Sequence, residues 1–568
     1  MARIFNPSID WSDQGNPISS GFDDIYYSRQ NGLRETALVF LHGNKLPDAW
    51  LHQNQFTIGE TGFGTGLNFL ATWKLFEETA TNGERLDFIS VEQYPMHKDT
   101  LAKALQGWRS EIGDAYVDRL LQVYPLRIPG FHRLWINDRV TLTLIFDNAL
   151  RGFRQLDGYM DAWFLDGFAP KKNPDMWQPE LYAEMARLSH SQTTIGSFTS
   201  VGHVRRGLKE VGFTMRREKG FGYKYHRITG VFENGPLKPA PQPPKNVTII
   251  GAGIAGAACA YALKRRGVAV TVLDKNPAPG MGASGNRLGL INPRIEVQDN
   301  PRNDAGLSAF GFAHHVLNDL ADIEYQKNGA LHLPSNDRKQ EKWDKIAKQT
   351  DWLEPHLQQR DNGIFFADSA SVNTAKLVQH LLAGIEVQYN RPVEKPDDTT
   401  PTILACGLGN RDFVDTHIRL QPVRGQVTYV QIPSLDLPQP LMFGHYIAPV
   451  HGDLFSLGAS FEKNNDIPAL SEQDDADNIA AAQTHVAMPS HTVTGHWAQI
   501  RTASHDRFPI IGKIPQFEQV YFTGALGSHG IQFGLLHGEI LACLLTGAPL
   551  PIGRDALQSL SINRFYQD

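Results

Sequence analysis

Three glycines alternate with other residues directly after an acidic side chain in the segment Glu60-Thr61-Gly62-Phe63-Gly64-Thr65-Gly66. Glycines let the backbone approach a bound molecule closely, and their N–H groups can face that molecule where a helix begins. A second acid, Glu92, ends the next apolar strand, where a carboxylate can bind ribose hydroxyl groups. We therefore predict that Glu60, Gly62, Gly64, Gly66 and Glu92 bind a nucleoside-containing cofactor. A purely structural turn is the alternative.

A third acid, Asp166, ends an apolar strand and is followed by a loop that Pro170 and Pro174 stiffen. Parallel α/β sheets bind ligands at the carboxyl ends of their strands. The family resemblance given below implies methyl transfer to an alkylamine, which needs a free lone pair, yet such an amine is mostly protonated at neutral pH. A neighbouring carboxylate can orient the ammonium group and accept its proton, and we predict this catalytic role for Asp166. A loop-capping aspartate is the structural alternative.

A sheet must hold these acids along one edge. Apolar runs with the character of strands occur at residues 37–41, 55–59, 86–91, 140–146, 161–166 and 193–198, with helical segments between most of them. This alternation predicts a doubly wound α/β domain with a mostly parallel sheet and helices on both faces. Asp147 follows one of these strands and is placed to accept a hydrogen bond from an adenine amino group; a solvated strand end explains it equally well.

This arrangement of a glycine loop and strand-end acids resembles the class I S-adenosylmethionine-dependent methyltransferases. The resemblance implies that S-adenosyl-L-methionine (SAM) is the cofactor. It also implies that Glu60 and the glycines hold the methionine part of SAM and that Glu92 holds its ribose.

Basic side chains are concentrated between residues 205 and 227. They outnumber the acids Glu210 and Glu218 and include Arg205, Arg206, Lys209, Arg216, Arg217, Lys219 and Lys224. These seven are predicted to bind the phosphate backbone of RNA, with Phe221 and Tyr223 available for aromatic contacts. A solvated charged surface is the alternative.

A second and different glycine motif begins after the apolar run 247–250. Gly251, Gly253 and Gly256 have the spacing of a dinucleotide-binding loop, and Asp274 ends the next strand, where it can bind a ribose. An acid at that position favours an unphosphorylated ribose and argues against NADP. The motif predicts a Rossmann-type cofactor domain.

Two later segments favour FAD over NAD as the cofactor of this domain. The loop 282–289 contains Ser284, Gly285 and Asn286, and the segment 520–531 leads from a strand through Gly527, Ser528 and Gly530 into a helix expected to begin near Leu535. These segments, together with the strand 401–407, resemble the glycine oxidase, D-amino-acid oxidase and sarcosine oxidase group. The resemblance implies a discontinuous FAD domain with an inserted α+β substrate domain.

Two residues match positions that face the substrate in that group: Tyr446 of the expected substrate domain, and Arg501 in the strand before the last cofactor segment. Arg501 has the planar fork that pairs with a carboxylate, and Tyr446 corresponds to a substrate-facing tyrosine. We predict catalytic-site roles for both. A surface ion pair for Arg501 and core packing for Tyr446 are the alternatives.

A proline-rich stretch separates the two glycine motifs, with five prolines between residues 235 and 244. Such a run is extended and semi-rigid. We therefore assign residues 1–235 to the methyltransferase domain, 236–245 to a linker and 246–568 to the FAD-dependent domain. Within the latter, the FAD-binding part covers about 246–310 and 500–568, and the substrate part covers about 310–500. We expect the two parts to be separately active after cleavage at the linker.

Bulk composition narrows the class of protein further. The chain has 568 residues, a net charge of −6 and only three cysteines, none of them at metal-ligand spacing. No apolar run is long enough to span a bilayer comfortably. We expect a cytoplasmic monomer with neither a metal nor a membrane segment.

The two motif sets together resemble the MnmC family of bifunctional tRNA-modifying enzymes over essentially the whole chain. The resemblance implies tRNA as partner and the wobble uridine as target. It further implies that the FAD part removes a carboxymethyl group from 5-carboxymethylaminomethyluridine or its 2-thio form, and that the SAM part methylates the resulting amine. The alternatives are an amino-acid or sarcosine-type oxidase fused to a small-molecule N-methyltransferase, and an RNA-binding scaffold without activity.

Overall fold

The computed structural model describes residues 4–28, 31–51, 53–222, 225–239, 242–348, 355–360 and 363–566. The chain forms two compact units. The first contains the chain up to Gln242 together with Thr546–Arg554, and the second contains Pro243–Leu545 and the chain from Asp555 onward. Lys224 and Tyr223, which we expected at an RNA surface, lie outside the described residues.

The first unit is built on an eight-stranded sheet with the order β10-β11-β9-β8-β4-β5-β7-β6. Its strands are β4 (Gln55–Glu60), β5 (Arg85–Val91), β6 (Gly130–Trp135), β7 (Val140–Phe146), β8 (Met160–Leu165), β9 (Ser189–Ser197), β10 (Phe213–Lys219) and β11 (His226–Phe232). The central strands β9, β8, β4, β5 and β7 are parallel to their neighbours in that series. The predicted doubly wound α/β fold is confirmed.

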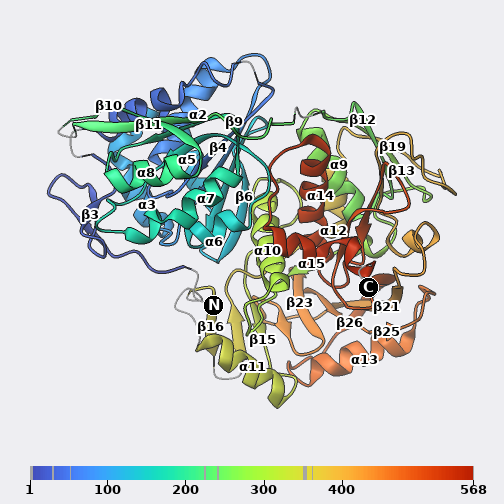
Figure 1. Cartoon of the computed structure of the whole chain (residues 1–568). Coiled ribbons are helices and arrows are strands. Elements are labelled where there is room, and N and C mark those ends of the chain that lie inside the picture. Colours follow the sequence, from blue (N-terminus) through green and yellow to red (C-terminus); the bar gives the residue numbers. More distant parts are fainter. Residues whose placement is uncertain are drawn as a thin grey trace. The chain divides into compact units, whose positions relative to one another are not determined.

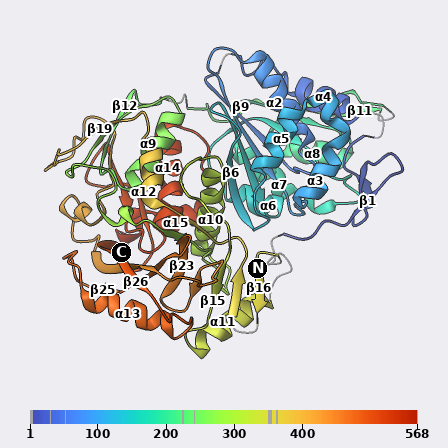
Figure 2. The same cartoon turned by 180° about the vertical axis from the view of Figure 1, so that it is seen from behind.

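Helices cover both faces of this sheet. On one face α6 (Ala149–Arg154), α7 (Pro179–Arg187) and α8 (Gly202–Glu210) lie next to one another (Figure 1). On the other, α2 (Leu67–Thr79), α4 (Arg109–Ile112) and α5 (Asp114–Val123) form a second group, with α3 (Lys98–Leu105) against α5 (Figure 2). The ridge of apolar residues on each helix therefore faces the sheet.

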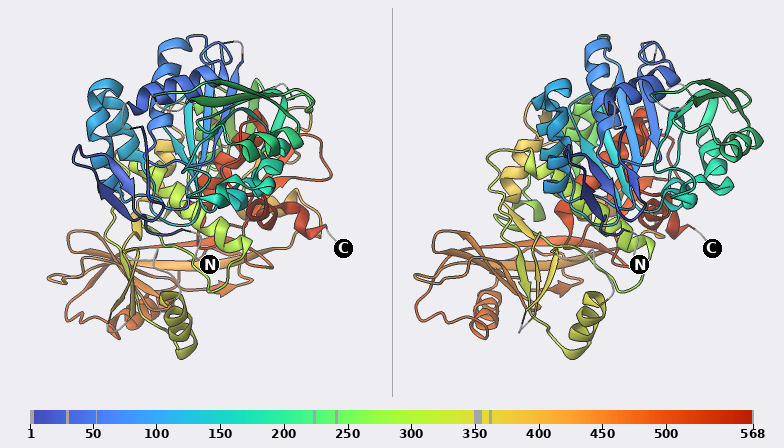
Figure 3. Two further views of the ribbon diagram at one scale, coloured as in Figure 1. Left: turned by 60° about the vertical axis from the view of Figure 1, so that its left-hand side comes forward. Right: turned by 90° about the vertical axis from the view of Figure 1, so that its left-hand side faces the viewer.

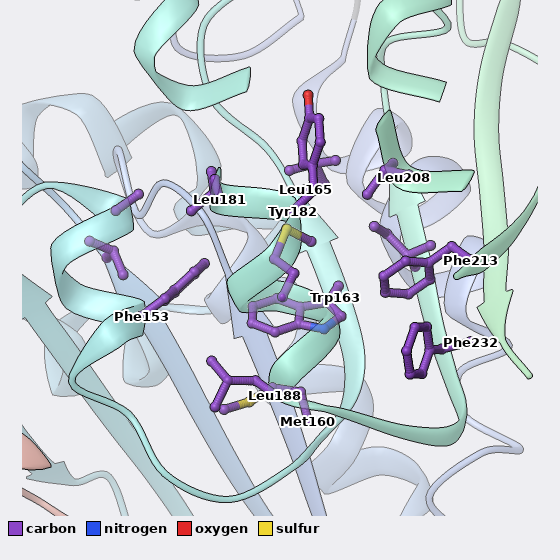
Figure 4. Close-up of a cluster of buried hydrophobic side chains, with 14 of the residues drawn as sticks. Phe153, Met160, Trp163, Leu165, Leu181, Tyr182, Leu188, Leu208, Phe213 and Phe232 are labelled. Atoms are coloured by element: carbon purple, nitrogen blue, oxygen red, sulfur yellow. The ribbon is translucent and has the colours of Figure 1, made fainter. Parts of the chain in front are cut away.

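A large aromatic residue fills the core on the first of these faces. Trp163 of β8 is fully buried among side chains of α6, α7, β9 and β10, including Phe153, Tyr182 and Phe213 (Figure 4). Its indole N–H is not left unpaired, because it donates to Ser189 Oγ at 2.9 Å. The packing keeps the carboxyl end of β8, and with it the Asp166 loop, in a fixed position.

The expected strand at residues 37–41 is wrong. Ala37–Leu41 continues the short helix α1 (Gly32–Thr36) as a π-helical turn. The Asn31 side chain caps α1, and Asn44 holds the turn by donating to Phe40 O at 2.9 Å and to Trp163 O at 3.2 Å. Five consecutive apolar residues fit a buried helix as well as a buried strand, so their pattern alone could not decide between the two.

A small antiparallel sheet precedes α1. It contains β1 (Ile9–Trp11), β2 (Pro17–Ser19) and β3 (Asp24–Ile25). We call residues 8–28 the N-terminal flap. Its last part, from Phe22 to Ser28, contributes to one wall of the cavity described below.

The second unit contains a Rossmann-type sheet with the order β19-β13-β12-β20-β28-β27. The strands are β12 (Asn246–Ile250), β13 (Ala269–Leu273), β19 (Glu386–Gln388), β20 (Thr402–Leu404), β27 (Ile510–Lys513) and β28 (Val520–Gly524). All neighbours are parallel except β27 and β28. Its helices include α9 (Ile254–Arg265), α10 (Pro301–Asn318), α12 (Thr374–Leu381), α14 (Gly530–Thr546) and α15 (Arg554–Leu560). The helix expected near Leu535 thus begins five residues earlier, at Gly530.

A nine-stranded sheet forms the other half of the second unit. It contains β15 (Ala330–His332), β16 (Leu357–Arg360), β17 (Gly363–Phe366), β21 (Leu420–Gln431), β22 (Leu441–Met442), β23 (Tyr446–His451), β24 (Leu454–Gly458), β25 (Glu462–Lys463) and β26 (Thr492–Ser504). The helices α11 (Asp337–Ala347) and α13 (Glu472–Gln483) lie on one side of it (Figure 3). A separate pair, β14 (Gly289–Ile291) and β18 (Ala370–Val372), lies outside this sheet. The expected α+β insertion is therefore present.

The segment Thr546–Arg554 groups with the first unit although it follows α14 in the chain. Arg133 of β6, whose side chain is fully buried, donates to Pro549 O. At the other end of the segment Arg554 forms an ion pair with Asp157 at 2.8 Å, and its backbone N–H donates to Gln155 O. The first unit is therefore made from two separate stretches of sequence.

Candidate active sites

The first unit contains a cavity of about 510 Å³ at the carboxyl ends of β4, β5, β7 and β8. This volume is typical of small-molecule sites. Its walls include Gly62 and Gly64 of the glycine loop and the three acids Glu92, Asp147 and Asp166. The strand order reverses beside β4, with β5 and β7 on one side and β8 and β9 on the other, which makes this edge the switch point where doubly wound folds bind ligands.

Asp166 is partly exposed in this cavity, and both carboxylate oxygens are oriented by donors. Oδ1 accepts from Gly167 N at 2.9 Å, and Oδ2 accepts from the Asn68 side-chain amide at 2.7 Å. The Thr61 hydroxyl also ties the backbone of Asp166 to the glycine loop by donating to Asp166 O at 2.6 Å. The carboxylate therefore has a defined orientation at the cavity wall.

Glu60 occupies a different place from the one expected. It is fully buried and does not line the cavity. One carboxylate oxygen accepts from Ser90 Oγ at 2.6 Å and the other from the Asn68 amide at 2.9 Å. Burial raises the pKa of Glu60 well above its usual range, and the nearby Asp166 charge adds to the increase. Any influence of Glu60 on a ligand passes through Asn68, which does line the cavity.

Glu92 connects the end of β5 to the glycine loop. Its Oε2 accepts from Gly64 N at 2.8 Å and its Oε1 from Tyr94 N at 2.7 Å. Burial raises the pKa of this carboxyl.

Asp147 lines the same cavity at the end of β7, and Arg151 Nε lies 3.6 Å from the Asp147 carboxylate. Gly66 does not line the cavity; it adopts a positive φ of 72° where α2 begins.

The predicted RNA-binding side chains come from two elements. Arg205, Arg206 and Lys209 belong to α8, and Arg216, Arg217 and Lys219 belong to β10, the edge strand of the sheet. Alternation along β10 places Arg217 and Lys219 on one face and Arg216 on the other. The loop after β10 leads to Phe221, which lines the cavity. The basic strand is thus followed, two residues after Lys219, by a residue that lines this cavity.

The second unit contains the predicted dinucleotide loop between β12 and α9. Gly251 has a φ of 112°, and a Cβ atom there would lie 2.5 Å from Ala405 O. A side chain at Gly256 would collide with Gly251 O, so both positions need glycine for the turn and for close helix–strand packing. Asp274 ends β13 and accepts from Ala252 N at 2.6 Å, which fastens the loop to the strand.

Two helices begin side by side at this loop. Ile254 is the first residue of α9 and Gly530 is the first residue of α14. A Cβ atom placed on Gly530 would lie 3.9 Å from Ile254 Cγ2. Gly538 of α14 in turn lies against Ala258 of α9, so the two helices are parallel. Their N-terminal N–H groups and dipoles combine at one place, which favours a pyrophosphate.

The remaining predicted cofactor residues surround these helix ends. Ser284 Oγ accepts from Ile254 N at 3.0 Å, and a Cβ on Gly285 would collide with the Trp497 ring. Gly253 and Gly527 leave open space, since a Cβ on Gly253 meets only Ser284 Oγ at 3.3 Å and one on Gly527 meets nothing within 4 Å. This glycine-lined space at two helix N-termini fits the pyrophosphate of a dinucleotide cofactor.

Tyr446 and Arg501, which we predicted to face the substrate, lie on the nine-stranded sheet. Asn286 Oδ1 accepts from the Tyr429 hydroxyl at 2.8 Å, and Tyr446 Oη lies 3.3 Å from Ser456 Oγ. Arg501 of β26 donates to Ser460 O at 3.0 Å. Leu526, which precedes the predicted cofactor residues Gly527 and Ser528, forms an antiparallel bridge with Ala503 of β26.

Arg501 is a partly buried cation. Among the residues that the structure describes, no carboxylate lies within ion-pair distance of its guanidinium group. Burial lowers the pKa of Arg501, and the opposing influence comes from the neighbouring Tyr446. Burial likewise raises the pKa of Tyr446. A partly buried guanidinium without an acid is costly unless a ligand carboxylate pairs with it.

Comparison with known proteins matches each unit to a different enzyme class. A family of FAD-dependent oxidoreductases matches residues 246–544, and a family of SAM-dependent methyltransferases matches residues 111–233. A protein of Pseudomonas aeruginosa, the tRNA 5-methylaminomethyl-2-thiouridine biosynthesis bifunctional protein MnmC, is 34% identical over 100% of this chain and 98% of its own length. Its counterpart in Chromohalobacter salexigens is 33% identical over 99% and 93%. The chain belongs to the MnmC family.

As a member of the MnmC family it is a bifunctional enzyme that uses FAD in one part and SAM in the other. Among solved structures, glycine oxidase from Bacillus cereus is similar, with a TM-score of 0.46 and 20% identity over 53% of this chain and 95% of that one. No helix in the described part of this MnmC-family chain is both long and apolar enough to cross a membrane.

Proposed function

We propose that the chain performs two successive steps on the wobble uridine of tRNA. The second unit removes the carboxymethyl group from 5-carboxymethylaminomethyluridine or its 2-thio form, and the first unit methylates the aminomethyl group that remains. One observation supports both steps. Each unit holds a charged group that matches one end of the same substrate arm, Arg501 for the carboxylate and Asp166 for the amine.

In the oxidative step Arg501 binds the substrate carboxylate through its two parallel N–H donors. FAD, when bound, would supply the hydride acceptor for oxidation of the carbon between that carboxylate and the amine; hydrolysis of the oxidised arm would release it as glyoxylate and leave the aminomethyl product. Tyr446 lines the substrate position and adds a hydroxyl group close to the Arg501 charge. Gly251, Gly253, Gly256, Asp274, Ser284, Gly285, Asn286, Gly527, Ser528 and Gly530 hold FAD.

In the methylation step Asp166 orients the ammonium group and accepts its proton, which frees the nitrogen lone pair. SAM, when bound, supplies the methyl group. Glu92 binds the ribose, Asp147 the adenine amino group, and Gly62, Gly64 and Gly66 shape the loop around the methionine part, with Glu60 supporting them from behind. The hydrogen bonds from Gly167 and Asn68 hold the Asp166 carboxylate in one orientation before the amine arrives.

Binding of tRNA is assigned to the basic side chains Arg205, Arg206, Lys209, Arg216, Arg217, Lys219 and Lys224. The connection between β10 and Phe221 supports this assignment, because an RNA strand held by the basic strand lies next to the cavity entrance. A monomer without bound metal, acting in the cytoplasm, remains a prediction.

Mass spectrometry of tRNA nucleosides tests the proposed order. tRNA carrying carboxymethylaminomethyluridine should give aminomethyluridine when SAM is withheld, and methylaminomethyluridine when SAM is added. Asp166→Asn should stop the sequence at aminomethyluridine even with SAM present. The matched control is Asp175→Asn, an exposed acid on the same loop that should behave as wild type. Full methylation by Asp166→Asn would refute the role of this carboxylate as proton acceptor.

A further inference from the structure

The N-terminal flap places aromatic rings beside the carboxylate assigned to methylation. Phe22 of the flap stacks on Phe168, two residues after Asp166, with ring centroids 4.8 Å apart and planes 27° apart. Tyr26 meets Phe168 edge-on at 5.2 Å, and Tyr94 meets Phe22 edge-on at 5.3 Å. Phe22, Tyr26, Tyr94 and Phe168 all line the cavity, and we call these four residues the aromatic wall.

The aromatic wall is fastened to the Asp166 loop by polar contacts. The Asp24 carboxylate accepts from Ala169 N at 2.9 Å, and Lys172 lies 3.1 Å from the Asp23 carboxylate. Tyr26 also packs on the glycine loop, since a Cβ on Gly64 would lie 3.3 Å from its ring. The flap therefore closes the cavity from the glycine loop to the Asp166 loop.

The rings of the wall are not part of the hydrophobic core. Phe22, Tyr26 and Phe168 are each partly exposed, unlike the fully buried Phe153 and Trp163 behind the sheet. Partly exposed aromatic rings that face a cavity are the usual platform for an unstacked nucleobase. An enzyme that acts on a base must take that base out of its stack and hold it between such side chains.

We propose that the aromatic wall is the binding site for the pyrimidine ring of the target nucleotide, extruded from its strand, during methylation. The inference rests on the function proposed above. The amine to be methylated is attached to the ring through a single methylene group, so an amine at Asp166 requires the ring within a few ångströms of that carboxylate. Phe168 lies two residues from Asp166 and satisfies this condition. Asn173 lines the same cavity, where its side-chain amide can bind the polar edge of the ring.

The test compares methylation of aminomethyluridine-containing tRNA by full-length variants. Phe22→Leu and Phe168→Leu should each lower kcat/KM for tRNA by about tenfold or more, the effect that stacking of one base has on binding. Phe168→Tyr, which keeps a ring, should restore most of the loss. Trp11→Leu is the matched control. Trp11 belongs to the same flap, but its ring lies 4.0 Å from Lys103 Nζ and does not line the cavity. An unchanged kcat/KM in both phenylalanine variants, or an equal loss in Trp11→Leu, would overturn the proposal.

A second measurement needs no variant. With the wild-type chain, free 5-aminomethyluridine should inhibit tRNA methylation, whereas a simple alkylamine at the same concentration should not. Equal inhibition by both compounds would mean that the ring is not bound and would also overturn the proposal. Failure of the proposed function gives a different result, because a wild-type chain that binds SAM would then leave aminomethyluridine in tRNA unmethylated.

Discussion

The side chain of Asn68 connects the two acids of the methyltransferase site, and its replacement tests that connection. The Thr36 hydroxyl donates to Asn68 Oδ1 at 2.7 Å, so the amide nitrogen must point the other way. Its two N–H groups then reach Glu60 at 2.9 Å and Asp166 at 2.7 Å. We predict that Asn68→Ala impairs methylation without affecting removal of the carboxymethyl group.

The size of the effect follows from the bond to Asp166. A hydrogen bond to a charged group contributes about 1.5–3 kcal/mol, and about 1.4 kcal/mol corresponds to a factor of ten in rate. Asn68→Ala should therefore lower kcat for methylation about 10- to 100-fold. Asn68→Asp should lower it further, because it places a third carboxylate between Glu60 and Asp166.

The measurement compares the two activities of the same variant. The assay is single-turnover methylation of aminomethyluridine tRNA, with oxidation of the carboxymethyl substrate as the internal control. Because the lost hydrogen bond orients the Asp166 carboxylate, the rate of methylation should fall while the rate of oxidation stays that of wild type. A methylation rate within twofold of wild type, or an equal loss of both activities, would refute the reasoning.

Three further predictions concern other parts of the chain. Arg501→Ala should raise KM for the carboxymethyl substrate at least tenfold and leave methylation unchanged, with the exposed Arg419→Ala as control; equal loss of both activities would contradict separate sites. Arg217→Ala with Lys219→Ala should reduce the salt dependence of tRNA binding by up to about two units of log–log slope, and an unchanged slope would exclude them from the phosphate contacts. Burial lowers the pKa of His132 from 6.5 to about 4, so its contribution to stability, about 3 kcal/mol, is present above pH 6.5 and is lost as pH falls toward 4. His132→Gln, which keeps a donor for Ile128 O, should flatten that part of the pH dependence of urea unfolding; an unchanged profile would contradict it.

The sequence predicted the parts of both sites that depend on local spacing. A glycine motif between a strand and a helix specifies a loop, and an acid at a strand end specifies a position at the sheet edge, so Glu92, Asp147 and Asp166 could be placed before the fold was known. The dinucleotide loop from Gly251 to Gly256 was predictable for the same reason.

Contacts between distant segments were not predictable from spacing. Asn68 belongs to no motif; the only signal in the sequence is its polar side chain in the first turn of the helix that follows the glycine loop. Glu60 was expected at the ligand because acids at strand ends usually face the ligand. Instead, hydrogen bonds from Ser90 of β5 and Asn68 of α2 hold the Glu60 side chain buried behind the cavity lining. The aromatic wall joins residues more than 140 positions apart, and no local spacing relates Phe22 or Tyr26 to Phe168.

Because the segment Thr546–Arg554 belongs to the first unit, cutting the chain at the proline run would leave the methyltransferase part incomplete. A polypeptide that stops at Gln242 lacks the carbonyl group that receives the buried Arg133 and the cation that pairs with Asp157. A cut at the proline run alone therefore does not separate the chain into two complete domains. Two fragments made there would recover the complete methyltransferase fold by complementation, with the downstream fragment donating nine residues to its partner. An independent methyltransferase would have to carry that segment as an added tail.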